Sequence, residues 1–401
     1  MKNIQTNVFE GIHSRISMRE SIEYTINSLT AYGANYDDWC IAWSGGKDSS
    51  TVVTLVVWLI ESGKIPAPKS LTVMYADTRM ELLPLSNSAS RIMDELREKG
   101  ITVEVVMADI EKRFLPYILG RGVPPSNNST FRWCTRQIKI DPMKAACERL
   151  FREKGKKVLM ITGVRQGESA IRDGRISMSC SKDGAECGQG WFQTTMPEAI
   201  CDTLAPILHW RVCHVWEWLK HWSPQAEFGD WSTKEIADAY GGDEAEEINA
   251  RTGCVGCPLA QKDTALDTIL KNLKWAYLSP LKGLREIYRE MRKPQYRLRQ
   301  TGEQRLKDGS IPNNPNRMGP LTIEARKKFF AEIIEIQESI NEAATILNTP
   351  KVDILNAEEI AFIHKCWEDN VFPNGWTGDE PLGDEPFDQI FRDGSIQKTL
   401  F

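Results

Sequence analysis

The sequence predicts an α/β fold, in which a parallel sheet carries helices on both faces and is followed by a mainly helical C-terminal region. Apolar strand-like segments alternate with helix-like segments. The strand-like segments are 39–43, 71–75, 101–106 and 157–161, and the helix-like segments are 14–32, 50–60, 83–99 and 141–154. After about residue 205 the chain becomes rich in tryptophan and helical in pattern, so we place a boundary there.

Each predicted strand is short and almost wholly apolar, which is typical of strands buried on both faces of a parallel sheet. Polar residues follow the strands, at 44–49, 77–78, 109 and 163–172. Ligands of such sheets bind beyond the carboxyl ends of the strands. These four segments are therefore the places where the sequence predicts a ligand site.

The first of them, Ser-Gly-Gly-Lys-Asp-Ser at 44–49, lies between a strand and a helix. A glycine turn and a helix N-terminus place several N–H groups around a small concavity that stabilises phosphate oxygens. Ser44, Ser49 and Lys47 add donors or charge, and we assign Asp48 to Mg²⁺. The spacing matches neither the Walker pattern nor the dinucleotide pattern. The alternative is an ordinary turn capped by Ser44.

This loop resembles the SGGxDS loop of the ATP pyrophosphatase superfamily, whose members split ATP between the α- and β-phosphates, and of the related adenylyl-sulfate reductases. The segment 163–172, Gly-Val-Arg-Gln-Gly-Glu-Ser-Ala-Ile-Arg, resembles the G-x-R-x-x-E-S-x-x-R signature of those reductases. Residues 77–81, Asp-Thr-Arg-Met-Glu, resemble the D-T-x-x-E stretch near the adenosine. The alternatives are a surface ion-pair loop at 163–172 and a helix N-cap at Asp77.

The resemblance implies an adenine nucleotide alpha hydrolase-like fold, bound ATP and Mg²⁺, and a set of nucleotide-binding residues. These are Ser44, Gly45, Gly46, Lys47, Asp48, Ser49, Asp77, Thr78, Gly163, Arg165 and Arg172.

Cys134 lies in a cationic segment with Arg132, Arg136 and Lys139. Neighbouring cations lower the pKa of a thiol and favour thiolate for metal binding or sulfur transfer, although a single cysteine is often only a small apolar residue. The segment also resembles the Cys…Lys…Pro stretch of the reductases. The implied catalytic residues are Asp48, Cys134, Lys139 and Arg165.

Cys254 and Cys257 form a C-x-x-C turn that supplies two thiolates, whereas a closed metal site needs about four ligands. By resemblance to the cluster-bearing reductases, Cys134 is the third ligand. The fourth is open: Cys187 or Cys180, with Cys213 as a further candidate. A 4Fe–4S cluster, zinc and no metal all remain possible. The relatives have two adjacent cysteines where Cys134 stands alone.

Composition limits the class of protein. The chain has 401 residues, 41% of them hydrophobic, and ten cysteines, which we expect to be reduced thiols or ligands. Without an apolar run of about twenty residues or a signal-peptide core, we expect a cytoplasmic protein with no membrane association. The net charge of −5 argues against a protein that coats nucleic acid unaided.

The C-terminal part contains a local excess of cations at 282–307, with nine Lys or Arg against three acidic residues. This stretch either contacts a phosphodiester backbone or is a solvated helix face. A capped amphipathic helix follows from residue 320. We predict three domains: an α/β domain at 1–205, a helical segment with the C-x-x-C at 206–280, and a basic, helical region at 281–401.

Taken together, these motifs resemble the DndC and SspD family of DNA phosphorothioation proteins. The chain lacks the extra cysteines near the C-x-x-C that are typical of DndC members, which weakens the cluster assignment. The resemblance implies DNA, a cysteine desulfurase and other phosphorothioation subunits as partners, in anti-phage defence. The implied reaction activates a DNA phosphate with ATP, giving AMP and pyrophosphate, before sulfur replaces a non-bridging oxygen. Two alternatives remain: a reductase of adenylyl sulfate, and a non-catalytic ATP-sensing DNA-binding subunit.

Overall fold

The computed structural model describes residues 16–127, 132–166, 200–241, 253–260, 262–300, 318–391 and 393–399. The chain divides into two compact units. The first consists of residues 1–76, 84–106 and 143–250, and the second of 77–83, 107–142 and 251–401. The units join stretches distant in the sequence, whereas the predicted domains 1–205, 206–280 and 281–401 are continuous. The two divisions differ because residues 77–83 and 107–142, which each follow a strand of the sheet, fold with the C-terminal part of the chain.

The first unit contains a five-stranded parallel sheet of order β3-β2-β1-β4-β5. Its strands are β1 (Asp38–Trp43), β2 (Ser70–Ala76), β3 (Thr102–Val106), β4 (Val158–Ile161) and β5 (Cys201–Leu204). The strand order reverses direction between β1 and β4, and ligand sites in open parallel sheets lie outside the carboxyl ends at such a point. Both strands end next to segments that the sequence predicts to bind nucleotide.

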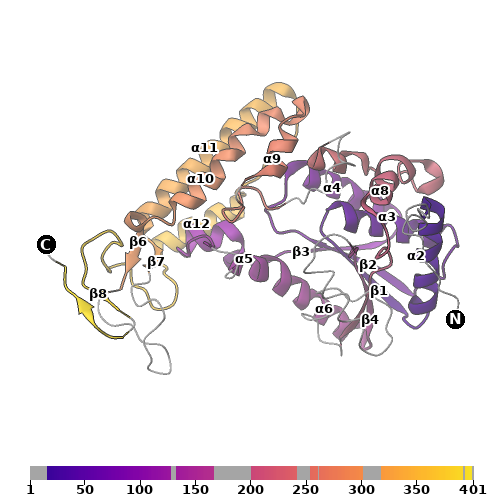
Figure 1. Ribbon diagram of the computed structural model, residues 1–401, viewed down its shortest axis with the longest axis horizontal. Coiled ribbons are helices and arrows are strands. Elements are labelled where there is room, and N and C mark those ends of the chain that lie inside the picture. Colours follow the sequence, from indigo (N-terminus) through magenta and orange to yellow (C-terminus); the bar gives the residue numbers. More distant parts are fainter. Residues whose placement is uncertain are drawn as a thin grey trace, which may run out of the picture. The chain divides into compact units, whose positions relative to one another are not determined.

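Helices cover both faces of this sheet (Figure 1). They are α2 (Met18–Gly33), α3 (Lys47–Glu61), α4 (Leu83–Glu98), α6 (Asp141–Lys154) and α8 (Val212–Glu217). Helix α6 packs its apolar stripe, which includes Met143, Cys147 and Leu150, against Met74 and Met160 of the strands. Helices α3 and α4 lie on the opposite face (Figure 1). The predicted α/β fold with helices on both faces is confirmed.

A tryptophan cluster completes the first unit and explains the Trp-rich stretch after residue 205. Trp216 and Trp218 are fully buried, and the indole N–H of Trp218 donates to Thr54 Oγ1 of α3 over 2.8 Å. These rings therefore pack in the core. The short elements around them are η4 (Trp218–Trp222), η5 (Ala226–Phe228) and η6 (Lys234–Tyr240).

The second unit is mainly helical. Its longer elements are η8 (Leu273–Leu281), α10 (Lys282–Glu290), α11 (Ile323–Leu347) and α12 (Ala357–Glu368). Its short elements are η1 (Ile110–Lys112), η2 (Pro116–Gly120), α5 (Trp133–Thr135), η3 (Arg136–Ile140), α9 (Thr264–Ile269) and η9 (Pro294–Tyr296). Its strand pairs are antiparallel: β6 (Arg297–Arg299) with β7 (Met318–Leu321), and β8 (Gln389–Ile390) with β9 (Ile396–Gln397).

Arg326 of α11 is a fully buried cation at the centre of this unit. Its guanidinium donates to the carbonyl oxygens of Leu321, Gly120 and Val371 at 2.8–3.1 Å. Burial lowers the pKa of Arg326 to about 10. The side chain thus ties α11 to two other segments by hydrogen bonds to the backbone. Among the described residues, no helix is long and apolar enough to cross a bilayer.

Candidate nucleotide site and cysteine cavity

The glycine loop, residues 44–49, connects β1 to the first turn of α3 in the first unit. Gly45 has φ +71°, a left-handed conformation that glycine adopts at little cost. Gly46 is the N-cap of α3, so the N-cap residue itself supplies no side-chain cap. Ser44 is therefore not the N-cap that the alternative of an ordinary turn assumed. The N-terminus of this 15-residue helix presents backbone N–H groups that no N-cap side chain satisfies.

The two serine hydroxyls of the loop face each other. Ser44 Oγ and Ser49 Oγ are 3.2 Å apart, and Ser49 Oγ also accepts from the backbone N–H of Ser44. Ser49 in turn donates to the carbonyl oxygen of Gly46 over 3.1 Å. These bonds close the loop on itself. Both hydroxyls are thereby held at the concavity that the sequence predicts for phosphate.

Asp48 is the electrostatic centre of the loop. Its Oδ1 atom lies 2.5 Å from Nε of Arg165, and its Oδ2 atom lies 3.1 Å from Nζ of Lys47. All three side chains are at most 13% exposed. Arg165 also donates to the carbonyl oxygen of Trp210 over 3.2 Å. The structure thus brings together Lys47, Asp48 and Arg165, two cations around one carboxylate, as a buried charge cluster.

Gly163 lies just beyond β4 and packs directly on the start of α3. A Cβ atom at this position would lie 2.7 Å from the backbone nitrogen of Ser49 and 2.8 Å from the carbonyl carbon of Asp48. Such contacts are too short for any side chain. The predicted residues Gly163 and Arg165 therefore both join the glycine loop, one by close approach and the other by charge.

Tyr240 is a residue of this site that sequence reasoning missed. Its hydroxyl accepts from the backbone N–H of Lys47 over 3.3 Å, and the ammonium of Lys47 lies 5.0 Å from the centre of its ring. Tyr240 is 3% exposed and packs edge-on against Trp216. Tyr240 lies 193 residues from Lys47 and belongs to no motif, so it could not be predicted from the sequence.

In the second unit, a cavity of about 80 Å³ gathers the predicted thiols. Cys134, Cys254 and Cys257 all line it, together with Lys139 and Thr78. Cys134 lies in α5, which continues through the π-helix η3 into α6. The structure therefore brings both of the predicted cysteine segments to one cavity, and Lys139 with them.

A tight turn holds the C-x-x-C. The N–H of Cys257 donates to the carbonyl oxygen of Cys254 over 3.2 Å, and Gly256 has φ +66°. A Cβ on Gly256 would lie 2.8 Å from Cβ of Leu284, so only glycine fits. Burial raises the pKa of Cys254 to about 12, and the negative charges of Glu81, Cys257 and Cys134 act in the same direction. Burial thus favours the neutral thiol of Cys254.

These thiols can be tested against the predicted metal. In the part of the chain that the structure describes, no group of three or more Cys, His, Asp or Glu side chains is arranged to hold a metal ion. The donor chemistry still fits a soft metal or cluster, because three thiols line one small cavity. Cys187 and Cys180 lie outside the described residues, as does Arg172. Cys213 is exposed on α8 of the first unit.

The predicted adenosine segment, Asp77 and Thr78, forms a tight turn in the second unit. Asp77 Oδ1 accepts from the N–H of Arg79 over 2.8 Å, and Thr78 Oγ1 donates to Glu81 over 2.6 Å. Arg79 has φ +61°, which is uncommon for a residue with a side chain. Because α4 begins only at Leu83, the alternative of a helix N-cap at Asp77 is wrong. Burial raises the pKa of Glu81.

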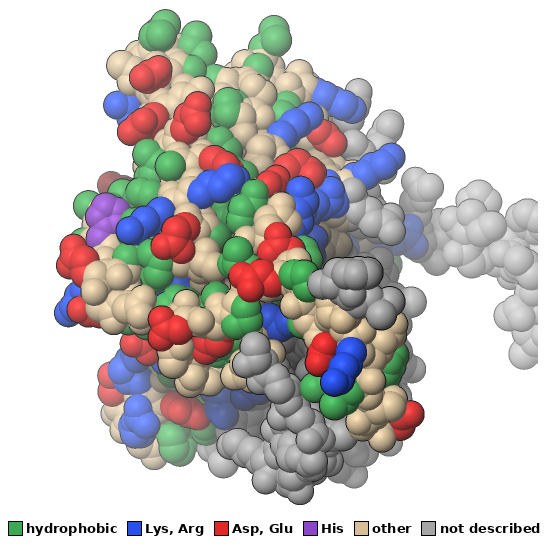
Figure 2. Space-filling view, turned by 90° about the vertical axis from the view of Figure 1, so that its left-hand side faces the viewer, with side chains coloured by type: hydrophobic (Ala, Val, Ile, Leu, Met, Phe, Trp, Pro, Cys, Tyr) green, Lys and Arg blue, Asp and Glu red, His purple; other side chains and the backbone are tan. Residues whose placement is uncertain are grey.

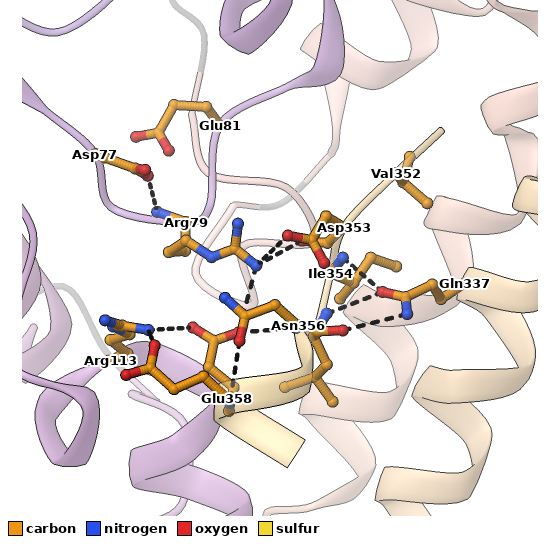
Figure 3. Close-up of polar contacts among 12 residues, drawn as sticks. Asp77, Arg79, Glu81, Arg113, Gln337, Val352, Asp353, Ile354, Asn356 and Glu358 are labelled. Carbon is orange, nitrogen blue, oxygen red and sulfur yellow. Dashed lines mark hydrogen bonds and ion pairs between the residues drawn. The ribbon is translucent and has the colours of Figure 1, made fainter. Parts of the chain in front are cut away.

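Arg79 anchors this turn to α12, as Figure 3 shows. Its guanidinium contacts the carboxylates of Asp353 (2.9 Å) and Glu359 (3.4 Å). Glu359 is 1% exposed, lies 3.5 Å from Arg113, and accepts from the N–H of Asn356 in a capping box. The next residue beyond Arg79, Met80, accepts from the N–H of Val255 in the C-x-x-C turn over 2.9 Å. One network therefore connects the Asp77 turn, α12 and the cysteine turn.

The basic stretch 282–307 is described up to residue 300, and most of its cations there have structural partners. Lys282, Arg289 and Lys293 pair with acidic residues, and Arg285 and Arg299 are buried and donate to backbone carbonyls. On the face drawn in Figure 2, Lys and Arg side chains alternate with Asp and Glu, and no continuous basic area is visible. Most of the described cations of this stretch are therefore engaged within the chain, and its contact with a phosphodiester backbone stays a prediction.

One family model matches the first part of this chain. Residues 38–223 match the phosphoadenosine phosphosulfate reductase domain family. That match covers the whole sheet and the glycine loop, and it supports the relation to the ATP pyrophosphatase superfamily.

Two uncharacterized proteins of Methanocaldococcus jannaschii are 27% and 26% identical over 179 and 178 residues. The matched segments cover 45% and 44% of this chain and only 30% and 34% of those proteins, so the chain spans about a third of their length.

Two solved structures show weak similarity, each at 14% identity. A variant of the Candida glabrata FMN adenylyltransferase gives a TM-score of 0.31 and covers 50% of this chain and 55% of its own. A U34-tRNA thiolase from Methanococcus maripaludis with its 4Fe–4S cluster gives 0.34 and covers 68% and 80%. Both scores are low, so neither structure indicates the activity of this chain.

Proposed function

We propose that this protein uses ATP to activate a phosphate of the DNA backbone so that sulfur can replace a non-bridging oxygen. The observation that carries the proposal is the glycine loop: Gly45 is left-handed, the N-cap of α3 is a glycine without a capping side chain, and Gly163 packs on the loop backbone. The match of residues 38–223 to a domain family named for an adenylylated sulfur compound supports it.

In this proposal a non-bridging phosphate oxygen of DNA attacks the α-phosphorus of ATP, and pyrophosphate leaves. Sulfur at the oxidation level of sulfide then attacks the DNA phosphorus, and AMP leaves with the original oxygen. If the sulfur arrives as a persulfide made by a cysteine desulfurase, two electrons from a thiol reductant complete the balance. The products are one phosphorothioate, one AMP and one pyrophosphate per ATP.

The loop residues have separate tasks in the first step. The N–H groups at the start of α3 and the hydroxyls of Ser44 and Ser49 would bind the phosphates. Asp48 would share Mg²⁺ with ATP, while Lys47, now 3.1 Å from Asp48, would turn to the phosphates. Arg165 would hold Asp48 in position through its 2.5 Å contact. Charge stabilisation of this kind acts on the pyrophosphate leaving group.

The cysteine cavity would serve the second step. Cys134, Cys254 and Cys257 would carry the sulfur or hold an iron–sulfur cluster, and a cluster held there would supply an iron site for the incoming sulfur. Lys139 at the same cavity would stabilise negative charge on sulfur. Other phosphorothioation subunits would deliver the DNA and sulfur.

Mass spectrometry of DNA tests this proposal. DNA is digested from cells that produce the full chain with a cysteine desulfurase and the other subunits, and phosphorothioate dinucleotides are counted. The wild type and Cys213→Ser, whose thiol is exposed and outside the cavity, should give them, and Cys254→Ser should not. Absence of phosphorothioate in the wild type, or its persistence in Cys254→Ser, would contradict the proposal.

The match to the reductase domain favours one second candidate, a reductase of adenylyl sulfate with Cys134 as nucleophile. Its test is direct: release of sulfite from adenylyl sulfate by the purified chain with a thiol reductant. Sulfite formation that is lost in Cys134→Ser, with no phosphorothioate in DNA, would favour this candidate instead.

A further inference from the structure

A groove of about 530 Å³ lies in the second unit, separate from the 80 Å³ cysteine cavity. Pockets that hold small ligands have volumes of roughly 300–1,000 Å³. Three aromatic side chains line the groove, Tyr117, Trp133 and Trp376, and two cations, Arg292 and Arg297. None of the described residues that line it is Asp or Glu. Aromatic rings with cations and without carboxylates are the combination that binds a base together with its phosphate.

Trp133 lies on the wall of this groove, and contacts with neighbouring residues hold its ring in place. Its ring stacks on Phe114 with 5.6 Å between centroids and 18° between planes, and it lies 4.8 Å from the ring of Tyr117. Its indole N–H donates to the carbonyl oxygen of Pro124 over 3.3 Å. The ring is nevertheless only half-buried. A rigid, partly exposed indole offers stacking area at little cost in side-chain entropy.

Arg292 brings positive charge to the same groove. Its Nη1 atom donates to the carbonyl oxygen of Ser126 over 3.3 Å, and it forms no ion pair with a described residue. Burial and the neighbouring charge of Arg289 lower the pKa of Arg292. By contrast, the adjacent Lys293 is exposed and pairs with Glu290. Arg292 is thus a half-buried cation whose charge a phosphate could compensate.

Ser126 points to a ligand independently of these charges. It is 4% exposed, and its Oγ atom is buried without a hydrogen-bond partner among the described residues. A buried hydroxyl without a partner is costly, and such groups in native proteins call for an explanation. Ser126 lines both the groove and the cysteine cavity. Trp133 of the groove and Cys134 of the cavity are also consecutive residues.

We propose that this groove holds one unstacked nucleotide of a DNA strand. The base stacks on Trp133, its phosphate lies at Arg292, and the hydroxyl of Ser126 donates to that phosphate. The shared wall then places this phosphate beside the cavity of Cys134, Cys254 and Cys257, where the sulfur would arrive. The proposal rests on the proposed function for its choice of DNA as the substrate.

The test measures binding without ATP, so that it does not depend on catalysis. The full chain is titrated into a single-stranded DNA 12-mer that carries one 2-aminopurine, whose fluorescence decreases when it stacks on an aromatic ring. Binding should quench the probe in the wild type and in Trp133→Phe, which keeps an aromatic ring. Trp133→Leu should lose the quenching and bind about tenfold more weakly, the size expected for one stacked base.

Arg292→Gln tests the phosphate contact against a matched control, Lys293→Gln. The first should weaken binding and lower the slope of log K against log salt by roughly 0.7, the value for one phosphate of a single strand. The second should change neither quantity by a comparable amount, because Lys293 is exposed and does not line the groove. Far-UV circular dichroism checks that each variant is folded.

Equal quenching in the wild type and Trp133→Leu, or equal salt slopes in Arg292→Gln and Lys293→Gln, would overturn the proposal. So would an RNA 12-mer or free ATP that binds the groove while the DNA does not. The two proposals fail separately: Trp133-dependent DNA binding without phosphorothioate in DNA would overturn only the proposed function. Phosphorothioate formed at the wild-type rate by Trp133→Leu would overturn only the groove.

Discussion

The Nε atom of Arg165 lies 2.5 Å from the Oδ1 atom of Asp48. Asp48 follows β1 and Arg165 follows β4, the two neighbouring strands between which the strand order reverses. Both groups are nearly buried, at 4% and 13% exposure. Lys47 contacts the other carboxylate oxygen of Asp48. The carboxylate of Asp48 therefore compensates the charges of both cations, Lys47 and Arg165, at the candidate nucleotide site.

Asp48→Asn should remove that compensation and leave two buried cations facing each other. Loss of one partner of a buried pair destabilises a protein by about 3–5 kcal/mol. Denaturant unfolding measures this effect. Asp94→Asn is the matched control, because Asp94 is 66% exposed and pairs only across the surface with Arg97, so it should cost less than about 1 kcal/mol. Equal losses in the two variants would contradict the burial of the Asp48 cluster.

Gly45→Ala tests the loop conformation. A side chain at the φ of +71° of Gly45 costs about 1–2 kcal/mol. The same cost applies to Gly63→Ala at φ +66°, where an added Cβ would have no atom within 4 Å beyond its chain neighbours. Both variants should therefore lose similar stability. Only Gly45→Ala should weaken ATP binding, measured by isothermal titration calorimetry. If both variants bind ATP as the wild type does, the loop does not hold the phosphates.

Glu359→Gln tests the anchor of the Asp77 turn. Glu359 is 1% exposed and its carboxylate contacts both Arg79 and Arg113, so neutralising it should cost about 3 kcal/mol in urea unfolding. The neighbouring Glu358 is 64% exposed and pairs with Arg113 alone among the described residues. Glu358→Gln should therefore cost less than about 1 kcal/mol. A reversed order of the two effects would be incompatible with this network.

The strands and helices of the sheet could be predicted to within a few residues, because each is a local apolar or periodic pattern bounded by turn residues. Helix α6 begins and ends where the sequence predicts. Strand β5 was missed, since Cys-Asp-Thr-Leu has no strand pattern and its place is set by pairing with β4. The C-terminal helix begins at Ile323, after the cap Thr322, and not at residue 320, because residues 318–321 form β7.

The site was predictable where chemistry is local, as in the glycine loop, and less so elsewhere. That Cys134 and the C-x-x-C share a cavity came from a resemblance to known reductases and not from spacing. Tyr240, Ser126 and the Arg79–Glu359 pair could not be predicted, because each interaction joins positions that only the folded chain brings together. The outcome for Cys187 and Arg172 stays a prediction, since both lie outside the described residues.

His214 should make the first unit less stable in mild acid. Its Nδ1 accepts from the N–H of Arg211, so Nε2 carries the proton and donates to the carbonyl oxygen of Ile16. Burial lowers the pKa of His214 below its usual 6.5. The unfolded chain then binds more protons than the folded chain below about pH 6.5. The free energy of unfolding should therefore have its full value above that pH and decrease as the pH falls below it.

His214→Gln should reduce this pH dependence by at most about 1.4 kcal/mol per pH unit, the value for one proton. Denaturant unfolding at pH 5.0 to 7.5, roughly the range in which histidine titrates, measures it. His221→Gln is the control, because His221 lies in the exposed part of η4. An unchanged slope in His214→Gln would show that folding does not lower the pKa of His214.

The most direct test of the central claim is the identity of the products formed from ATP. The purified chain is incubated with Mg²⁺ and ATP labelled at the α- and γ-phosphates, with and without single-stranded DNA. If the glycine loop binds the phosphates of ATP, AMP and pyrophosphate should form in equal amounts. Gly45→Ala should lose this activity, and Gly63→Ala should retain it. Formation of ADP and phosphate, or undiminished AMP formation in Gly45→Ala, would contradict the claim.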